Sequence, residues 1–161
     1  MADVAVINAS PLIFLSRGNQ LDLLHRLVNR ILVPEPVARE IRTKGPEDMT
    51  VKALDSVAWL GHADPPAIPE IILSWGLGPG ESSVLAIARS HPGMEAIIDD
   101  LAGRRCAAFL GIPVRGTLGI VLTAKQRGYI AAARPVIEDL VRSGLYLSRQ
   151  ILDEALKRVG E

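Results

Sequence analysis

The segment VAVINASPLIFL, residues Val4–Leu15, decides the fold class of this chain. Its first part, Val4–Ile7, is apolar and short, which is typical of a buried strand. The strand stops at Asn8 and a helix follows at once, for which we predict Ser10 as N-cap and Pro11 as the first helical residue. A strand that leads directly into a helix indicates an α/β protein, and the polar residue between them lies where such folds bind ligands. An amide occupies this point, although a carboxylate would be the better ligand for a cation.

The composition fits a folded chain of one domain. The chain has 161 residues, of which 48% are hydrophobic and 22% charged, enough to bury a core. Because 18 Lys and Arg balance 18 Asp and Glu, no net charge draws the chain to nucleic acid or membrane, although a local basic rim can still steer RNA. The single cysteine, Cys106, excludes an internal disulfide and favours a cytoplasmic location. We expect neither a signal peptide nor a membrane-spanning segment.

Apolar runs alternate with helical patterns along the rest of the chain. We predict further strands at 31–33, 95–98 and 112–115, which makes four strands in all. We expect helices at 11–28, 36–45, within 47–61, at 79–91 and 101–111, and three at the C-terminus between 117 and 160, each with glycine at its end. Residues 62–70, HADPPAIPE, are predicted to be a loop. Strands separated by helices give a single α/β domain, residues 1–161, with a parallel β-sheet covered by helices on both faces.

Four positions with oxygen-bearing side chains fall at the predicted strand ends and helix starts. They are Asn8, Glu40, Glu81 and the pair Asp99–Asp100. Parallel sheets bind ligands beyond the carboxyl ends of their strands, so these side chains are expected to converge. Converging carboxylates repel one another unless a cation neutralises them, and an oxygen-only ligand set selects Mg²⁺ or Mn²⁺. Such ions activate water and stabilise the leaving oxygen in phosphodiester cleavage.

Each of these positions also has a purely structural interpretation. Asn8 suits a turn, and Glu40 suits a solvated helix face. Glu81 in a first helical turn stabilises the helix dipole by about 0.3–1 kcal/mol. One of Asp99 and Asp100 suits the N-cap of the helix that follows. Strand alternation points only one of that pair into a pocket, and the sequence leaves open which one.

The order of these motifs resembles the PIN-domain nucleases, most closely the prokaryotic branch related to VapC-type toxins. The motifs are the strand-ending Asn8 with SPLI, then PEPVAREI, GPGESSVLAIA, IIDDLAGRR and GTLGIVLTAKQRG, running from residue 4 to about residue 128. The helices at 132–159 are compatible with the same domain. The resemblance implies a PIN-like α/β/α sandwich whose acidic pocket binds Mg²⁺ or Mn²⁺ and cleaves RNA. It also implies a toxin held inactive by an antitoxin protein, and a homodimer.

Carried over residue by residue, the resemblance implies a set of functional side chains. These are Glu40, Glu81, Asp99 and Asp100 for catalysis, and Asn8, Glu81, Asp99 and Asp100 for the metal. Arg104 matches the basic residue after the paired aspartates and, with Ser10, is a candidate for substrate binding. Asn8 stands where the family usually has its first metal-binding aspartate. Its amide oxygen can coordinate Mg²⁺, but it brings no charge and cannot act as a base.

Three functions are compatible with these residues. The first is a metal-dependent ribonuclease, the toxin of a toxin–antitoxin pair. The second is a catalytically weakened PIN scaffold that binds RNA or a protein partner without cleaving, an interpretation that rests on Asn8. The third is a phosphoacceptor receiver module, because Asp99–Asp100, Thr117 and Lys125 offer the acid pair, threonine and lysine of such modules. The strand order argues against the third, since receivers carry the acid pair after their first strand.

Overall fold

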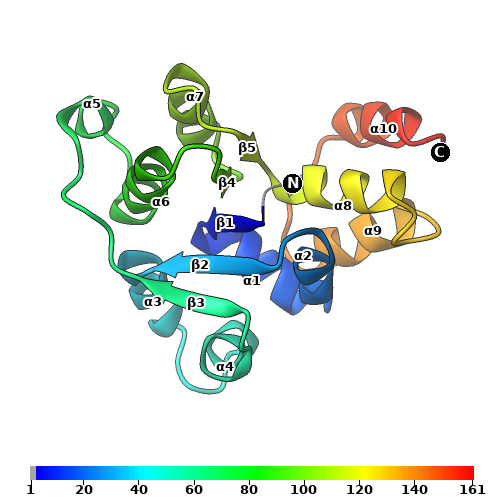
Figure 1. The fold of residues 1–161 in the computed structure, drawn as a ribbon. Helices are drawn as coiled ribbons and strands as arrows, with labels where there is room; N and C mark the ends of the chain where they lie inside the picture. The colour runs from blue at the N-terminus through cyan, green and yellow to red at the C-terminus, as the bar shows by residue number, and fades with distance from the viewer. Residues whose placement is uncertain (1–2) are drawn as a thin grey trace.

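The computed structural model describes residues 3–161 and contains one parallel sheet with the strand order β3-β2-β1-β4-β5 (Figure 1). The strands are β1 (Val4–Ile7), β2 (Arg30–Pro34), β3 (Leu60–Ala63), β4 (Glu95–Ile97) and β5 (Val114–Arg115). β1 lies at the centre, and its Ala5, Val6 and Ile7 are completely buried. A central strand of a parallel sheet is covered on both faces, which is why it reads as a continuous apolar run.

Helices connect and flank the strands. They are α1 (Ala9–Arg17), α2 (Leu21–Leu27), α3 (Glu35–Arg42), α4 (Met49–Ser56), α5 (Glu70–Leu73), α6 (Pro79–Ser90), α7 (Leu101–Phe109), α8 (Thr117–Gln126), α9 (Arg134–Arg142) and α10 (Arg149–Arg158). α6 packs against β1, α3 and α7, whereas α8 packs against α2, α9 and α10. Figure 1 shows α8, α9 and α10 grouped together at one side of the molecule, with α3, α5 and α6 at the other. The parallel α/β architecture predicted from the sequence is confirmed.

The sheet has a fifth strand that the sequence did not predict. We expected a helix within 47–61 and a loop from His62, but α4 ends at Ser56 and β3 follows it. The strand sequence LGHA has neither an apolar run nor a clear alternation, so it carries no local strand signal. Its backbone forms a strand because it pairs with β2 at the edge of the sheet. The short helix α5 was missed as well.

The predicted helix at 11–28 is two helices, and it begins earlier than predicted. α1 ends at Arg17 with Gly18 as its C-cap, and Asn19 has a φ of 57°, a left-handed conformation that asparagine tolerates. The N-cap is Asn8 rather than Ser10, which lies exposed in the first helical turn. Pro11 still fits inside that turn, because the N–H groups of a first turn have no partner within the helix.

The strand order reverses between β1 and β4, and this reversal positions the candidate site. β1 pairs in parallel with β2 on one side and with β4 on the other. Sheets of this kind bind ligands in the crevice beyond the strand ends at such a reversal. Asn8 directly follows β1, and Asp99 and Asp100 closely follow β4. Three candidate side chains therefore start beside this crevice.

Candidate functional site

A hollow of about 280 Å³ lies beyond the end of β1. It is lined by Asn8 and Ser10 from the start of α1, by Glu40 from α3 and by Glu81 from α6, together with the backbone around residues 78–80. These four residues are separated by up to 73 positions in the sequence, from 8 to 81, and the parallel topology brings them to one edge of the sheet. The hollow joins an amide, a hydroxyl and two carboxylates.

Gly80 sets how closely α6 approaches the side chains from α1 and α3. A Cβ atom at this buried position would lie 3.1 Å from Oδ1 of Asn8 and 3.4 Å from Oε2 of Glu40. Both oxygens therefore converge on the same point of the α6 backbone. Any larger residue would push one of them away, so the glycine of the GPG sequence is what allows the three segments to meet.

Asn8 presents a buried amide to this hollow. Only 6% of its surface is exposed, although it is polar and lies at a helix start. As the N-cap of α1 it makes no side-chain capping hydrogen bond, so helix α1 lacks the stabilisation of about 1 kcal/mol that a capping side chain gives. Its amide instead lines the hollow together with Glu81 and lowers the pKa of that carboxyl. An aspartate at this position would instead repel the carboxylate of Glu81.

Glu81 is a carboxylate in an unfavourable environment for its charge. Burial raises the pKa of Glu81 above its usual value, and the negative charges of Asp100 and Glu40 raise it further. Hydrogen bonds from the backbone of Gly78 and from the side chain of Asn8 act in the opposite direction, and the net shift is upward. The repulsion shows that Asp100, Glu40 and Glu81 share one electrostatic neighbourhood, which a cation would stabilise.

Asp99 and Asp100 are adjacent in sequence but have different partners. Asp100 is the N-cap of α7, and its Oδ2 accepts a hydrogen bond of 3.1 Å from the backbone N–H of Gly103. Its charge acts on Glu81. Asp99 instead accepts two hydrogen bonds from the fully buried Thr117, at 2.7 Å from the backbone N–H and 2.6 Å from Oγ1. The structure therefore brings Asp100 to Glu81 and directs Asp99 toward the start of α8.

Arg104 lies one helical turn after Asp100 on α7. Its guanidinium points to Gly116, where an added Cβ atom would collide with Nη1. The neighbouring Gly103 is buried against the pocket, because a Cβ there would lie 3.8 Å from Cγ of Glu81. The first turn of α7 thus places Arg104 beside the acidic group. Within residues 3–161, Arg104 forms no ion pair shorter than 4 Å.

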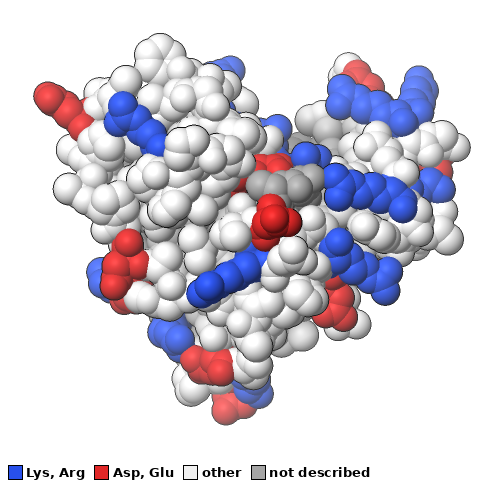
Figure 2. All heavy atoms as spheres, in the orientation of Figure 1, with Lys and Arg blue, Asp and Glu red and all other residues white. Residues whose placement is uncertain are grey.

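Two arginines of α1 and α3 are paired with carboxylates. Arg17 pairs with Asp48 at 3.1 Å, and Arg42 pairs with Asp55 at 2.9 Å. Basic and acidic side chains are also interspersed over the face shown in Figure 2. The described residues therefore form no continuous basic surface on that face. Arg104 has no carboxylate partner within residues 3–161, so its guanidinium N–H groups are left for a ligand.

A comparison with protein families identifies this architecture. The chain matches, over residues 4–161, the model of a family described as DUF3368: PIN domain. The chain belongs to the PIN-domain family. Among curated proteins, no relative matches it. PIN domains are generally nucleases, which are hydrolases, and they typically use divalent metal ions.

The donor atoms of this PIN domain fit a hard divalent cation that is held loosely. They are the amide oxygen of Asn8 and the carboxylates of Glu40, Glu81 and Asp100, without sulfur or imidazole. Within residues 3–161, no three His, Cys, Asp or Glu side chains lie close enough together to hold one metal ion. Mg²⁺ commonly binds through one or two carboxylates, keeps several waters, and takes further oxygens from a substrate phosphate. The pocket fits that manner of binding and does not fit a closed zinc-type site.

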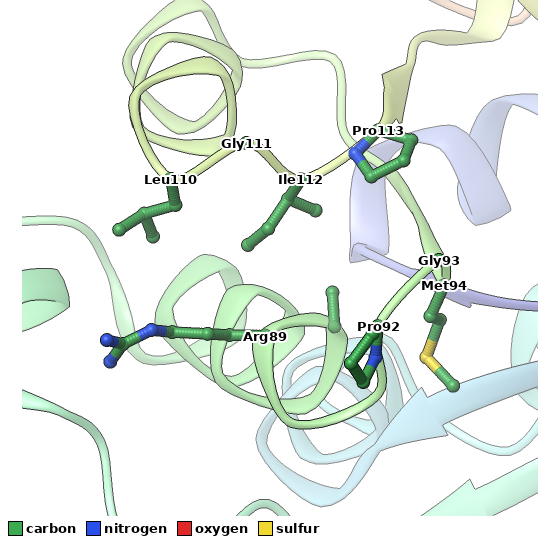
Figure 3. A pocket seen from close by; sticks show the side chains of 9 residues that line it. Arg89, Pro92, Gly93, Met94, Leu110, Gly111, Ile112 and Pro113 are labelled. Carbon is green, nitrogen blue, oxygen red and sulfur yellow. The ribbon is translucent and has the colours of Figure 1, made fainter.

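A second hollow of about 250 Å³ lies near the amino ends of strands β4 and β5 of the PIN domain, where α6 and α7 end (Figure 3). Its side chains are mostly apolar, among them Met94, Leu110 and Ile112. Arg89 is the charged residue of this hollow, and its guanidinium extends away from the apolar side chains in Figure 3. Without converging polar groups, this hollow offers no chemistry, so the candidate site is the one around Asn8.

Helices in the described part of the chain are all too short or too polar to cross a membrane.

The roles of four residues of the site were not predicted from the sequence. Gly80, Gly103 and Gly116 were read as parts of motifs, whereas each leaves room for a side chain of the site. Thr117 was considered only as part of a receiver module, whereas it binds Asp99. The GTLG motif was the available signal, but its partner lies 18 residues earlier, which no local pattern reveals.

Proposed function

We propose that this PIN domain is a Mg²⁺- or Mn²⁺-dependent endoribonuclease of the VapC-like branch. The observation that carries the proposal is the gathering of Asn8, Glu40 and Glu81 in one hollow, with the charge of Asp100 acting on Glu81. A set of mutually repelling carboxylates stabilises the protein only when a cation joins it. In a family of nucleases, that arrangement supports metal-assisted cleavage of a phosphodiester.

Each residue has a role that follows from its position. Asn8, Glu81 and Asp100 would hold the ion, because Asn8 and Glu81 line the same hollow and Asp100 has the largest charge effect on Glu81. A bound divalent ion would polarise the phosphate and lower the pKa of the attacking water. Glu40 is exposed at the rim of the hollow and is the carboxylate left to take a proton from that water. Ser10, exposed at the same rim, and Arg104 would hold phosphates of the RNA.

The biological setting in this proposal rests on the motif order from Asn8 to Gly128. That order resembles toxins that an antitoxin protein inhibits and that form homodimers, so we propose both kinds of partner for this chain. We also place the protein in the cytoplasm, because its single cysteine, Cys106, is buried and free. Co-purification with the product of an adjacent gene, and the mass of the purified protein in solution, test these partners directly.

A second function has one observation in its favour. Asn8 removes one negative charge from the position where the family usually has an aspartate, and this weakens attraction for a cation. A PIN scaffold that binds RNA or a protein partner without cutting is therefore the alternative. Restoring the charge with Asn8→Asp distinguishes the two.

The experiment that tests the proposal is cleavage of a panel of single-stranded and structured RNAs in Mn²⁺ or Mg²⁺, with EDTA controls. The wild type is compared with Glu81→Gln, with Asn8→Asp, and with Glu138→Gln as a matched control on the exposed surface of α9. Metal-dependent cleavage by the wild type and the control, lost in Glu81→Gln, supports the nuclease. Cleavage gained only in Asn8→Asp supports the binding scaffold. Silence in every variant refutes the nuclease assignment.

A further inference from the structure

We propose that Asp99 is a positioning residue for Arg104 and not a ligand of the metal. Within the aspartate pair, Asp100 then binds the ion, and Asp99 supports binding of the substrate phosphate. This inference rests on the proposed function, because it assigns the phosphate-binding side of the same site. It differs from the expectation drawn from the family, which counts both aspartates as one acidic position.

The first step is that Thr117 fixes the direction of the carboxylate of Asp99. Both of its oxygens accept hydrogen bonds from Thr117, one from the backbone N–H at 2.7 Å and one from Oγ1 at 2.6 Å. Thr117 is fully buried, so water does not compete for these bonds. These two bonds hold the carboxylate of Asp99 against the start of α8. Asp100, in contrast, uses only Oδ2 in its capping bond.

The second step is the space at Gly116. A Cβ atom there would lie 3.0 Å from Oδ1 of Asp99 and would also collide with Nη1 of Arg104. The carboxylate and the guanidinium therefore enter the same small volume, which exists only because residue 116 is glycine. The N-terminus of α8 carries a partial positive charge that disfavours a cation, and the carboxylate of Asp99 offsets it. Asp99 thus allows Arg104 to lie at this place.

The third step is that Arg104 keeps its donors available. It is exposed, and no carboxylate in residues 3–161 lies within 4 Å of its guanidinium, Asp99 included. An exposed guanidinium that is not paired with a carboxylate is suited to bind a phosphate through two parallel N–H bonds. Gly103, the residue before it, packs against Glu81, so this phosphate would be close to the scissile one.

The experiment separates metal binding from RNA binding. Mn²⁺ affinity is measured by calorimetry without RNA, and affinity for a short single-stranded RNA of mixed sequence is measured by fluorescence anisotropy in EDTA at several salt concentrations. The variants are Asp99→Asn, Asp100→Asn, Arg104→Ala and Gly116→Ala. Arg105→Ala, an exposed neighbour on α7, is the matched control. Thr117→Ser keeps both hydrogen bonds to Asp99 and serves as the conservative variant.

We expect Asp99→Asn, Gly116→Ala and Arg104→Ala each to bind Mn²⁺ as the wild type does and to bind RNA about tenfold more weakly. In each, the slope of log affinity against log salt falls by about 0.7, the value for one phosphate contact to a single strand. Adding Asp99→Asn to Arg104→Ala has no further effect on RNA affinity, since both remove the same contact. Thr117→Ser and Arg105→Ala keep the wild-type values, and Asp100→Asn loses Mn²⁺ affinity.

Other outcomes overturn specific statements. If Asp99→Asn lowers Mn²⁺ affinity as much as Asp100→Asn does, Asp99 is a ligand and this inference fails while the proposed function stands. If Arg104→Ala leaves RNA affinity and the salt slope unchanged, Arg104 contacts no phosphate and the inference fails in the same way. A wild type that binds neither Mn²⁺ nor RNA refutes the proposed function itself. Melting temperatures of all variants show whether a loss reflects unfolding, and Gly116→Ala is expected to fold because the colliding atom is the free end of a long side chain.

Discussion

The guanidinium of Arg115 and the carboxylate of Glu95 form an ion pair of 2.5 Å between strands β5 and β4. The side chain of Glu95 is 7% exposed and that of Arg115 31%. Arg115 also donates a hydrogen bond of 2.5 Å to Oγ1 of Thr123 on α8. Because β5 has only two residues, its backbone ladder alone fixes it weakly. The ion pair therefore secures β5 and the start of α8, where Thr117 holds Asp99.

Replacing Arg115 by methionine tests how much this pair stabilises the fold. We expect Arg115→Met to lower the free energy of unfolding by about 2–3 kcal/mol, because it leaves the buried carboxylate of Glu95 without a partner. Urea denaturation measures the change. The comparison is Arg42→Met, which breaks an exposed pair with Asp55 and is expected to cost less than about 1 kcal/mol. Equal losses in the two variants would contradict a special role for the buried pair.

The raised pKa of Glu81 predicts a stability that depends on pH in the absence of metal. A carboxyl whose pKa is higher in the folded state stabilises the protein below its unfolded value of 4.5, and this contribution is lost as the pH rises through the folded pKa. We expect Glu81→Gln to raise the melting temperature in EDTA at neutral pH, since it removes a buried charge repelled by Asp100 and Glu40. Below pH 4.5 the wild type and Glu81→Gln should melt at similar temperatures.

Adding Mn²⁺ should reverse the order of these two proteins. A ligand present at about 100 times its dissociation constant stabilises the folded state by about 2.7 kcal/mol. The wild type gains this stabilisation, whereas Glu81→Gln, which lacks a ligand, gains little. Thermal melting with and without Mn²⁺ at neutral pH checks both statements, and a Glu81→Gln protein that Mn²⁺ stabilises as strongly as the wild type would remove Glu81 from the metal site.

Asn8→Asp is expected to lower the stability of the metal-free protein and to raise its affinity for the metal. A new carboxylate beside Glu81 adds repulsion and removes the amide that lowers the pKa of Glu81, so the melting temperature in EDTA should fall. The same charge should raise the affinity for Mn²⁺ about tenfold. The free energy of this change is only a modest fraction of the attraction between two close opposite charges. Calorimetry and thermal melting measure the two effects. Asn19→Asp, at an exposed left-handed position, is the control that should change neither by a comparable amount.

Gly80→Ala tests the close approach of α6. The added methyl group would lie 3.1 Å from Oδ1 of Asn8, which is buried and cannot move away easily. Alanine favours a helix over glycine by about 0.5–1 kcal/mol, and crowding costs about 1–3 kcal/mol, so we expect a small net loss of stability. Mn²⁺ affinity should fall clearly, because Asn8 is displaced. Gly78→Ala is the comparison, since its methyl group would meet no atom closer than 4.0 Å, and a loss as large as that of Gly80→Ala would argue against displacement.

The order of strands and helices supplied most of what could be predicted. Val4–Ile7 reads as a buried strand because a central strand is apolar on both faces, and parallel topology then places Asn8, Glu40 and Glu81 at one edge. β3 could not be predicted from LGHA, since its strand conformation comes from pairing with β2 and not from its own residues.

The different partners of Asp99 and Asp100 could not be predicted from the sequence either. Alternation indicates that neighbouring side chains point in different directions, but β4 ends at Ile97 and the backbone turns before the pair. Which aspartate meets Glu81 depends on Thr117, which is distant in sequence and joins Asp99 only in the folded chain. The same holds for Gly116, whose role depends on the reach of Arg104 from another helix.

The hydrogen bonds from Thr117 to Asp99 also bear on how the protein is made. The residues around the pocket and its supporting contacts extend along the chain from Asn8 to Thr117. While the chain is being synthesised, Asn8, Glu40 and Glu81 are all present before β4, Asp100 and α8 exist to complete the arrangement. A nascent chain that ends before Thr117 therefore lacks part of the site, and a ribosome carrying it is not yet exposed to the finished pocket.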